Sequence, residues 1–118
     1  MKKCTCGIKQ WYCDNRCNMN ELIIKIEEWA NKRGLLKEEN APRQFMKVVE
    51  ETGEVAEGLA KNNQELLKDG IGDVVVTLII LAKQKGMTLH ECLETAYNEI
   101  KDRTGETKDG VFVKSEDL

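Results

Sequence analysis

The chain has 118 residues, which is enough for one domain with a core of its own. Its net charge is -3 and no basic stripe is present, which argues against nucleic acid as a partner. On this acidic background a small anionic ligand would need local cations or a metal ion. Charged residues make up 33% and apolar residues 41%, a balance that favours a helical protein with solvated outer faces and is compatible with further burial by self-association.

The ends and apolar stretches of the chain bear on its location. No apolar run follows the two N-terminal lysines, so a signal peptide is not predicted. The longest apolar stretch, residues 74–82, is too short to span a bilayer. We therefore expect a cytoplasmic protein without membrane association, in a compartment where thiols stay reduced.

Residues 1–19 differ from the rest, because they hold most of the cysteines and show no helical period. We expect them to form an irregular arm, separate from a domain of residues 20–118. Their cysteines are spaced Cys-x-Cys, six residues, Cys-x3-Cys, which could hold one Zn²⁺ through four thiolates; reduced thiols in a flexible arm and a redox switch are the alternatives. These cysteines are Cys4, Cys6, Cys13 and Cys17.

Four helices are expected after this arm. Asn20 is a candidate cap for the first helix, and Gly34 ends it. Thr88 opens a capping box for the fourth helix, which ends near Arg103. The second and third helices are expected at residues 42–61 and 64–85, and a short extended tail or strand at residues 111–113.

The sequence VVVTLI in the third helix is β-branched and could instead be a buried strand. Its flanks are helical and no turn residues bracket it, so the helix is favoured. A helix that is apolar all round is expected at the centre of a bundle. The fold class predicted is therefore all-α, a four-helix bundle.

The second helix carries an unusual concentration of acids within VVEETGEVAEGLA, residues 48–60. Like charges one turn apart on a helix repel by a few tenths of a kcal/mol per pair. Glu50, Glu54 and Glu57 share one face, and Glu51 lies about a quarter turn away, beside the apolar stripe. A solvated face explains Glu57 and remains an alternative for Glu50.

Asp73 stands directly before the apolar stretch of the third helix, with Asp69 one turn earlier on the same side. A buried carboxylate without a partner costs several kcal/mol or takes up a proton. A metal ion removes that cost, and so does an ion pair with a lysine or arginine of a neighbouring helix. Gly70 and Gly72 would let another helix or a ligand come close.

Carboxylates favour Mg²⁺, with Mn²⁺ as the alternative. A di-iron bundle would need Glu-x-x-His pairs, whereas the single histidine, His90, lies in the expected capping turn of the fourth helix. Because Mg²⁺ usually shares its coordination with substrate phosphates, the acidic cluster indicates phosphate-ester or phosphoanhydride chemistry.

At these residues the sequence resembles the MazG-like nucleoside triphosphate pyrophosphohydrolases of the all-α pyrophosphatase superfamily. The family pattern is Glu-x-x-Glu on one helix and Glu-x-x-Asp on the next. Glu51 and Glu54 match the first half, and Asp73 matches the last position. Gly70 departs from the pattern, and Asp69 or Glu50 could supply the missing carboxylate. The resemblance extends from about residue 20 to the C-terminus.

The resemblance implies hydrolysis of a nucleoside triphosphate to the monophosphate and pyrophosphate by a water molecule that the metal activates. It implies Glu51, Glu54 and Asp73 as metal ligands, Asp69 as a supporting ligand, and Glu50 or Glu51 as the catalytic carboxylate, Glu50 being the better candidate to orient or deprotonate the water. It also implies a homo-oligomer, a dimer or a tetramer, with sites near the interface.

The substrate-binding residues that the resemblance implies are on the last helix, where surface charge near a helix end is the alternative explanation. They are Asn98, Lys101 and Arg103, with Lys47 and Gln44 of the second helix as weaker candidates. Two other functions stay open: a non-catalytic helical interaction module, which the departure at Gly70 would support, and hydrolysis of another nucleotide phosphoanhydride.

Overall fold

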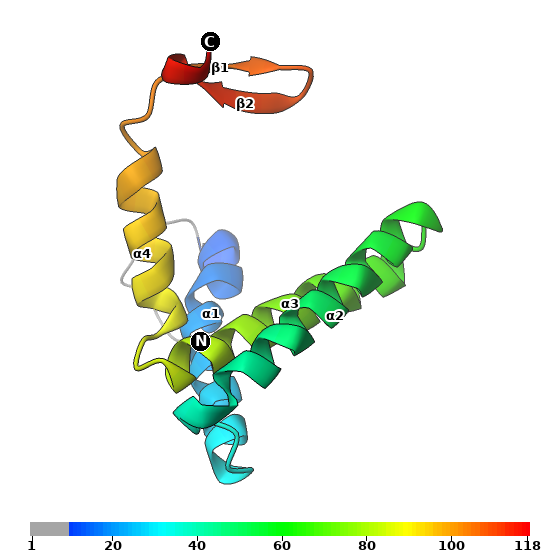
Figure 1. The fold of residues 1–118 in the computed structure, drawn as a ribbon, viewed down its shortest axis with the longest axis vertical. Helices are drawn as coiled ribbons and strands as arrows, with labels where there is room; N and C mark the ends of the chain where they lie inside the picture. Colours follow the sequence, from blue (N-terminus) through cyan, green and yellow to red (C-terminus); the bar gives the residue numbers. More distant parts are fainter. Residues whose placement is uncertain (1–9) are drawn as a thin grey trace.

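The computed structural model describes residues 10–118, with side chains from residue 19 on. Over these residues four α-helices precede a two-stranded hairpin (Figure 1), and the all-α prediction is confirmed. The helices are α1 (Gln10–Lys32), α2 (Ala41–Ala60), α3 (Gln64–Gln84) and α4 (Leu89–Ile100), the strands are β1 (Gly105–Lys108) and β2 (Val111–Lys114), and 3-10 turns lie at Glu38–Asn40 and Ser115–Asp117.

Helix α1 begins at Gln10, ten residues before the predicted cap, so the prediction that Asn20 starts the helix is wrong. No glycine or proline interrupts residues 10–32, and polar side chains extend a helix that has already formed. The irregular arm predicted for residues 1–19 is therefore wrong for its second half. Residues 1–9, with Cys4 and Cys6, lie outside the described residues.

The remaining helix ends follow the sequence signals. Pro42 lies in the first turn of α2. The side chains of Asn63 and Thr88 cap α3 and α4, each accepting a hydrogen bond of 3.1 Å from a backbone N–H three residues on. Gly86 follows the end of α3 at a φ of +76°, a conformation that glycine adopts readily. VVVTLI is helical, as predicted.

Helices α2 and α3 form an antiparallel pair that holds most of the packing (Figure 1). Two glycines let the helices approach closely. A Cβ at Gly58 would lie 2.9 Å from the backbone nitrogen of Leu67, and a Cβ at Gly70 would lie 3.2 Å from Cγ2 of Val55. The expectation that another helix approaches the glycines of α3 is thus confirmed for Gly70, whereas Gly72 has nothing within 4 Å.

The core of the single chain is small. Its buried apolar residues, among those described, are Ala30 of α1 and Ile79, Ile80 and Ala82 of α3. Only the second half of α3 lies at the centre of the helices as predicted, because α1 crosses α3 there. The first half of α3 leaves one apolar face exposed. Helix α4 leaves the end of α3 and projects away from the α2–α3 pair (Figure 1), so one chain does not close a four-helix bundle.

The C-terminal residues form an antiparallel hairpin in which Lys108 of β1 is paired with Val111 of β2. Asp109 and Gly110 connect the strands with φ values of +50° and +79°, as a two-residue type I′ turn requires. The extended tail predicted at residues 111–113 is β2, and its partner β1 was not predicted. Within the described part of the chain, no helix is long and apolar enough to cross a membrane.

Candidate metal centre

Three carboxylates converge between α2 and α3. Each of Glu51, Glu54 and Asp73 offers an oxygen that lies within 4.8 Å of the other two. Glu51 and Glu54 are three residues apart and therefore share a side of α2. Asp73 comes three residues after Gly70, whose backbone lies close against Val55 of α2. The packing of the two helices thus holds like charges together.

The described side chains include no positive partner for this cluster. Among the described residues, none of the three carboxylates forms an ion pair with a lysine, arginine or histidine. Oε2 of Glu51 is buried and has no hydrogen-bond partner. The described side chains therefore offer no ion-pair partner to Asp73 from a neighbouring helix.

The electrostatics of the cluster favour uptake of a cation. A hydrogen bond to Glu54 raises the pKa of Glu51, and burial and the charges of Glu54, Asp73 and Glu50 raise it further. Burial is the main cause that raises the pKa of Asp73, followed by the charges of Asp69 and Glu54 and a hydrogen bond to Asp69. Binding of a proton or a divalent cation would reduce this repulsion between the carboxylates and the cost of their burial.

The donor set fits a hard divalent cation such as Mg²⁺ or Mn²⁺. All three groups are carboxylates, and the unpartnered Oε2 of Glu51 is a free acceptor inside the cluster. Asp69 lies beside the cluster, one turn before Asp73, and its charge contributes to the raised pKa of Asp73. Gly70, where the family pattern has an acid, is buried against Val55.

Other acids and amides of α2 have different surroundings. Glu50 is exposed and forms an ion pair of 3.3 Å with Lys47, so both lie at the edge of the cluster on the solvent side. Nε2 of Gln44 donates a hydrogen bond of 3.1 Å to the carbonyl oxygen of Thr77, which ties α2 to α3. Gln44 therefore has a structural role in the single chain.

The substrate-binding residues expected on the last helix are not brought to the cluster within one chain. Asn98 lies in α4, and Lys101 and Arg103 follow it. From Asp73 to the start of α4 is roughly 20 Å along α3, and α4 then points away from α2 (Figure 1). The cysteines of α1 are Cys13 and Cys17, and their side chains lie outside the described ones.

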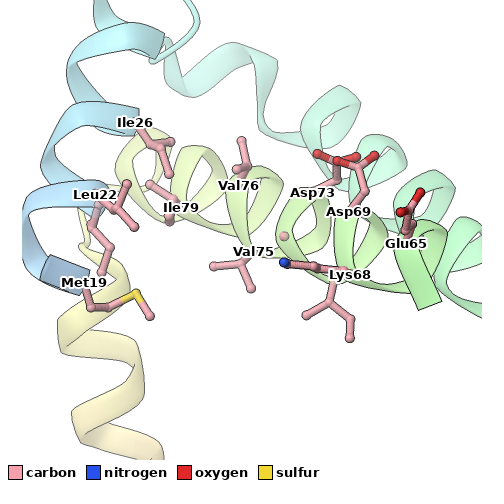
Figure 2. Close-up of a pocket in the computed structure, with 13 residues that line it drawn as sticks. Met19, Leu22, Ile26, Glu65, Lys68, Asp69, Asp73, Val75, Val76 and Ile79 are labelled. Carbon is pink, nitrogen blue, oxygen red and sulfur yellow. The ribbon is translucent and has the colours of Figure 1, made fainter. Parts of the chain in front are cut away.

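A groove of about 850 Å³ beside the carboxylates was not predicted. Figure 2 shows Met19, Leu22 and Ile26 of α1 at one end and Asp69 and Asp73 of α3 at the other. The apolar periodicity of each helix was visible in the sequence. The crossing of α1 over α3, which creates the groove, has no sequence signal of its own.

Residues 43–107 match the model of the MazG nucleotide pyrophosphohydrolase domain. The chain is also 45% identical, over 67 residues, to an uncharacterized 18.2 kDa protein in the rep-hol intergenic region of Haemophilus phage HP1. The aligned part covers 57% of this chain and 41% of the phage protein, so the chain spans about two fifths of that relative. No solved structure matches the chain.

Proposed function

The chain belongs to the MazG nucleotide pyrophosphohydrolase family, and we propose that it hydrolyses ribo- or deoxyribonucleoside triphosphates to the monophosphate and pyrophosphate with Mg²⁺ or Mn²⁺. The observation that supports this most is the convergence of Glu51, Glu54 and Asp73 within 4.8 Å without a balancing cation. The bound ion would neutralise phosphate charge and lower the pKa of a water molecule.

Each acid has a proposed role that follows from its surroundings. Glu51, Glu54 and Asp73 hold the cation. Asp69 lies one turn before Asp73 on α3, and its negative charge acts on Asp73, so it supports the ligand set. Glu50 is exposed and next to Glu51, so it can accept a proton from water or orient it. Lys47, its ion-pair partner, is exposed and can turn to a phosphate group.

The test is pyrophosphate release from a panel of canonical and modified NTPs and dNTPs, with Mg²⁺, with Mn²⁺ and with EDTA. We expect release that depends on the metal and that Glu54→Gln and Asp73→Asn each reduce by at least about 100-fold, the scale typical of lost charge stabilisation. Glu57→Gln is the matched control, because Glu57 lies one turn from Glu54 but forms an ion pair with Lys61.

The outcomes separate the competing functions. Release that the two site variants lose and the control keeps supports the proposal. Release only from nucleoside diphosphates or dinucleotides would favour hydrolysis of another phosphoanhydride. If folded protein cleaves no nucleotide, the proposal fails and a non-catalytic interaction module becomes the better explanation. Gly70, which lacks the carboxylate of the family pattern, is the residue that supports that module.

We also propose Zn²⁺ at the N-terminal cysteines, as a structural ion separate from catalysis. Cys13 and Cys17 are four residues apart in α1, a spacing that places both on one side of the helix. Cys4 and Cys6 would complete four thiolates. Zinc content of the purified protein tests this: the double variant Cys13→Ser, Cys17→Ser should lose the ion and Cys92→Ser, in α4, should keep it.

A further inference from the structure

The C-terminal hairpin closes a small cavity against the segment that follows α4. Two short stretches line it, residues 103–104 after the helix and residues 114–116 at the end of β2. Its volume of about 240 Å³ is well above the roughly 30 Å³ of one water molecule, so a small polyatomic ion fits. The hairpin lies beyond α4, away from the α2–α3 pair (Figure 1), and the cavity is therefore separate from the candidate metal centre. We call it the hairpin cavity.

The backbone holds the two lining stretches against each other. Strand β1 begins at Gly105, directly after Thr104, and Gly105 is paired with Lys114 of β2. The backbone N–H of Ser115 donates a hydrogen bond of 2.9 Å to the carbonyl oxygen of Thr104. A Cβ at Gly105 would collide with the carbonyl oxygen of Val113, so this close approach requires glycine. The hairpin cavity is thus built into the paired backbone.

Two cations line this cavity on a chain whose net charge is negative. They are Arg103 and Lys114. The guanidinium of Arg103 has no ion pair and no hydrogen-bond partner among the described residues. Lys114 reaches Glu116 only at 4.0 Å, in an exposed pair of a kind that contributes little. Two cations at one cavity repel each other, and an anion between them would remove that repulsion.

Two hydroxyl groups add a hydrogen-bond donor to the lining. Oγ1 of Thr104 and Oγ of Ser115 are 2.8 Å apart, so one hydroxyl donates to the other. This bond uses one of the two hydroxyl protons, and neither group has a further side-chain partner among the described residues. The second proton can therefore be donated to a ligand. Guanidinium, ammonium and hydroxyl donors at one cavity are suited to the oxygens of a phosphate group.

We propose that the hairpin cavity binds a phosphate group, held by Arg103, Lys114 and the hydroxyl pair of Thr104 and Ser115. This anion site is formed within one chain, needs no metal ion and goes beyond the proposed function. Its ligand is either free inorganic phosphate or the end of a longer anion such as pyrophosphate or a nucleoside triphosphate, which present the same oxygens. The lining has no aromatic side chain on which a base could stack, so recognition is confined to the phosphate.

The test follows the backbone amides of the full chain by NMR in EDTA, while inorganic phosphate, pyrophosphate or a nucleoside triphosphate is added at constant ionic strength. We expect the amides of Thr104 and Ser115 to shift and to saturate with each anion, whereas screening by salt would act on the whole surface. Tighter binding of pyrophosphate and triphosphate than of phosphate would identify a longer anion as the ligand. Equal affinities would identify a single phosphate group.

Variants that change the charge identify the side chains that hold the anion. Arg103→Ala and Lys114→Ala should each weaken binding by about 10-fold, the scale of one charge-assisted hydrogen bond. Lys108→Ala is the matched control, because Lys108 lies at the other end of the same hairpin and should leave the affinity unchanged. Glu116→Gln should tighten binding, since Glu116 is the one negative group in the lining, whereas Glu106→Gln, on β1 outside the cavity, should not.

Three results would overturn the anion site. They are the absence of a saturable shift at Thr104 and Ser115, equal affinities of Arg103→Ala and Lys108→Ala, and loss of binding in Asp73→Asn, which would place the anion at the metal centre instead.

A folded hairpin and an independent outcome keep this test decisive. The amide spectrum of each variant shows whether the hairpin is intact. If Arg103→Ala unfolds it, Arg103→Lys keeps the charge but loses the planar fork, and it should still bind the anion more weakly than wild type. A chain that cleaves no nucleotide but shows these shifts would refute only the proposed function, and an active enzyme without them would refute only the anion site.

Discussion

The close approach of α2 and α3 can be tested with one substitution at two glycines of α2. Alanine is favoured over glycine inside a helix by about 1 kcal/mol, a gain that applies to Gly53→Ala and Gly58→Ala alike. A Cβ at Gly53 meets nothing within 4 Å, whereas a Cβ at Gly58 would lie 2.9 Å from the backbone nitrogen of Leu67. A backbone atom cannot rotate aside, so the helices must separate, and overpacking of this kind costs about 1–3 kcal/mol.

We therefore expect Gly53→Ala to stabilise the protein by up to about 1 kcal/mol and Gly58→Ala to be neutral or destabilising by up to about 2 kcal/mol. Thermal unfolding followed by circular dichroism measures both, and about 4 °C of Tm corresponds to 1 kcal/mol in a domain of this size. Separation of the helices should also reduce the Tm increase that Mg²⁺ gives in Gly58→Ala but not in Gly53→Ala. Equal stability of the two variants would refute the reasoning from helix contact.

Three further predictions concern the carboxylates and one cap. In EDTA, Glu54→Gln should raise the Tm, because it removes the repulsion of Glu54 from Glu51 and Asp73. Addition of Mg²⁺ should then raise the Tm of this variant little further. A variant less stable than wild type in EDTA would contradict this. In the folded protein the pKa values of Glu51 and Asp73 are raised above their ordinary values of 4.5 and 3.8. Protonation of these groups therefore stabilises the metal-free protein fully at a pH below the ordinary values. This stabilisation is lost as the pH rises through the folded-state pKa values. Mg²⁺ should accordingly raise the Tm most near neutral pH and progressively less as the pH falls toward that window, and a Tm increase independent of pH between 4 and 7 would count against the cluster as the binding site. Asn63→Ala should cost about 1 kcal/mol in denaturant unfolding, because it removes the hydrogen bond that caps α3.

The candidate site was predictable from the sequence to the extent that helical spacing determines it. Glu51 and Glu54 are three residues apart on one helix, and Asp73 precedes an apolar run that leaves it little access to water. The role of Gly70 could not be predicted, because it depends on the distance between two helices and on Val55 opposite. The groove beside Asp73 was missed for the same reason.

The fold was predictable where local signals exist and not where they are lacking. Caps, the proline in α2 and the Asp109–Gly110 turn are local, and the structure has them. The start of α1 was misplaced, because the expectation used apolar periodicity and residues 10–19 are mostly polar. The direction of α4 is not local at all, since its apolar stripe indicates only that something covers it.

Gly70 and Asp69 determine where a fourth carboxylate lies relative to the candidate metal centre. On a helical wheel the positions three and four before Asp73 flank it on opposite sides, about 100° apart. Gly70 faces Val55 of α2. The Cβ of an acidic side chain there would lie 3.2 Å from Cγ2 of Val55. Asp69 lies on the other side and lines the groove between α1 and α3. The fourth carboxylate therefore lies toward the groove and not in the space between α2 and α3.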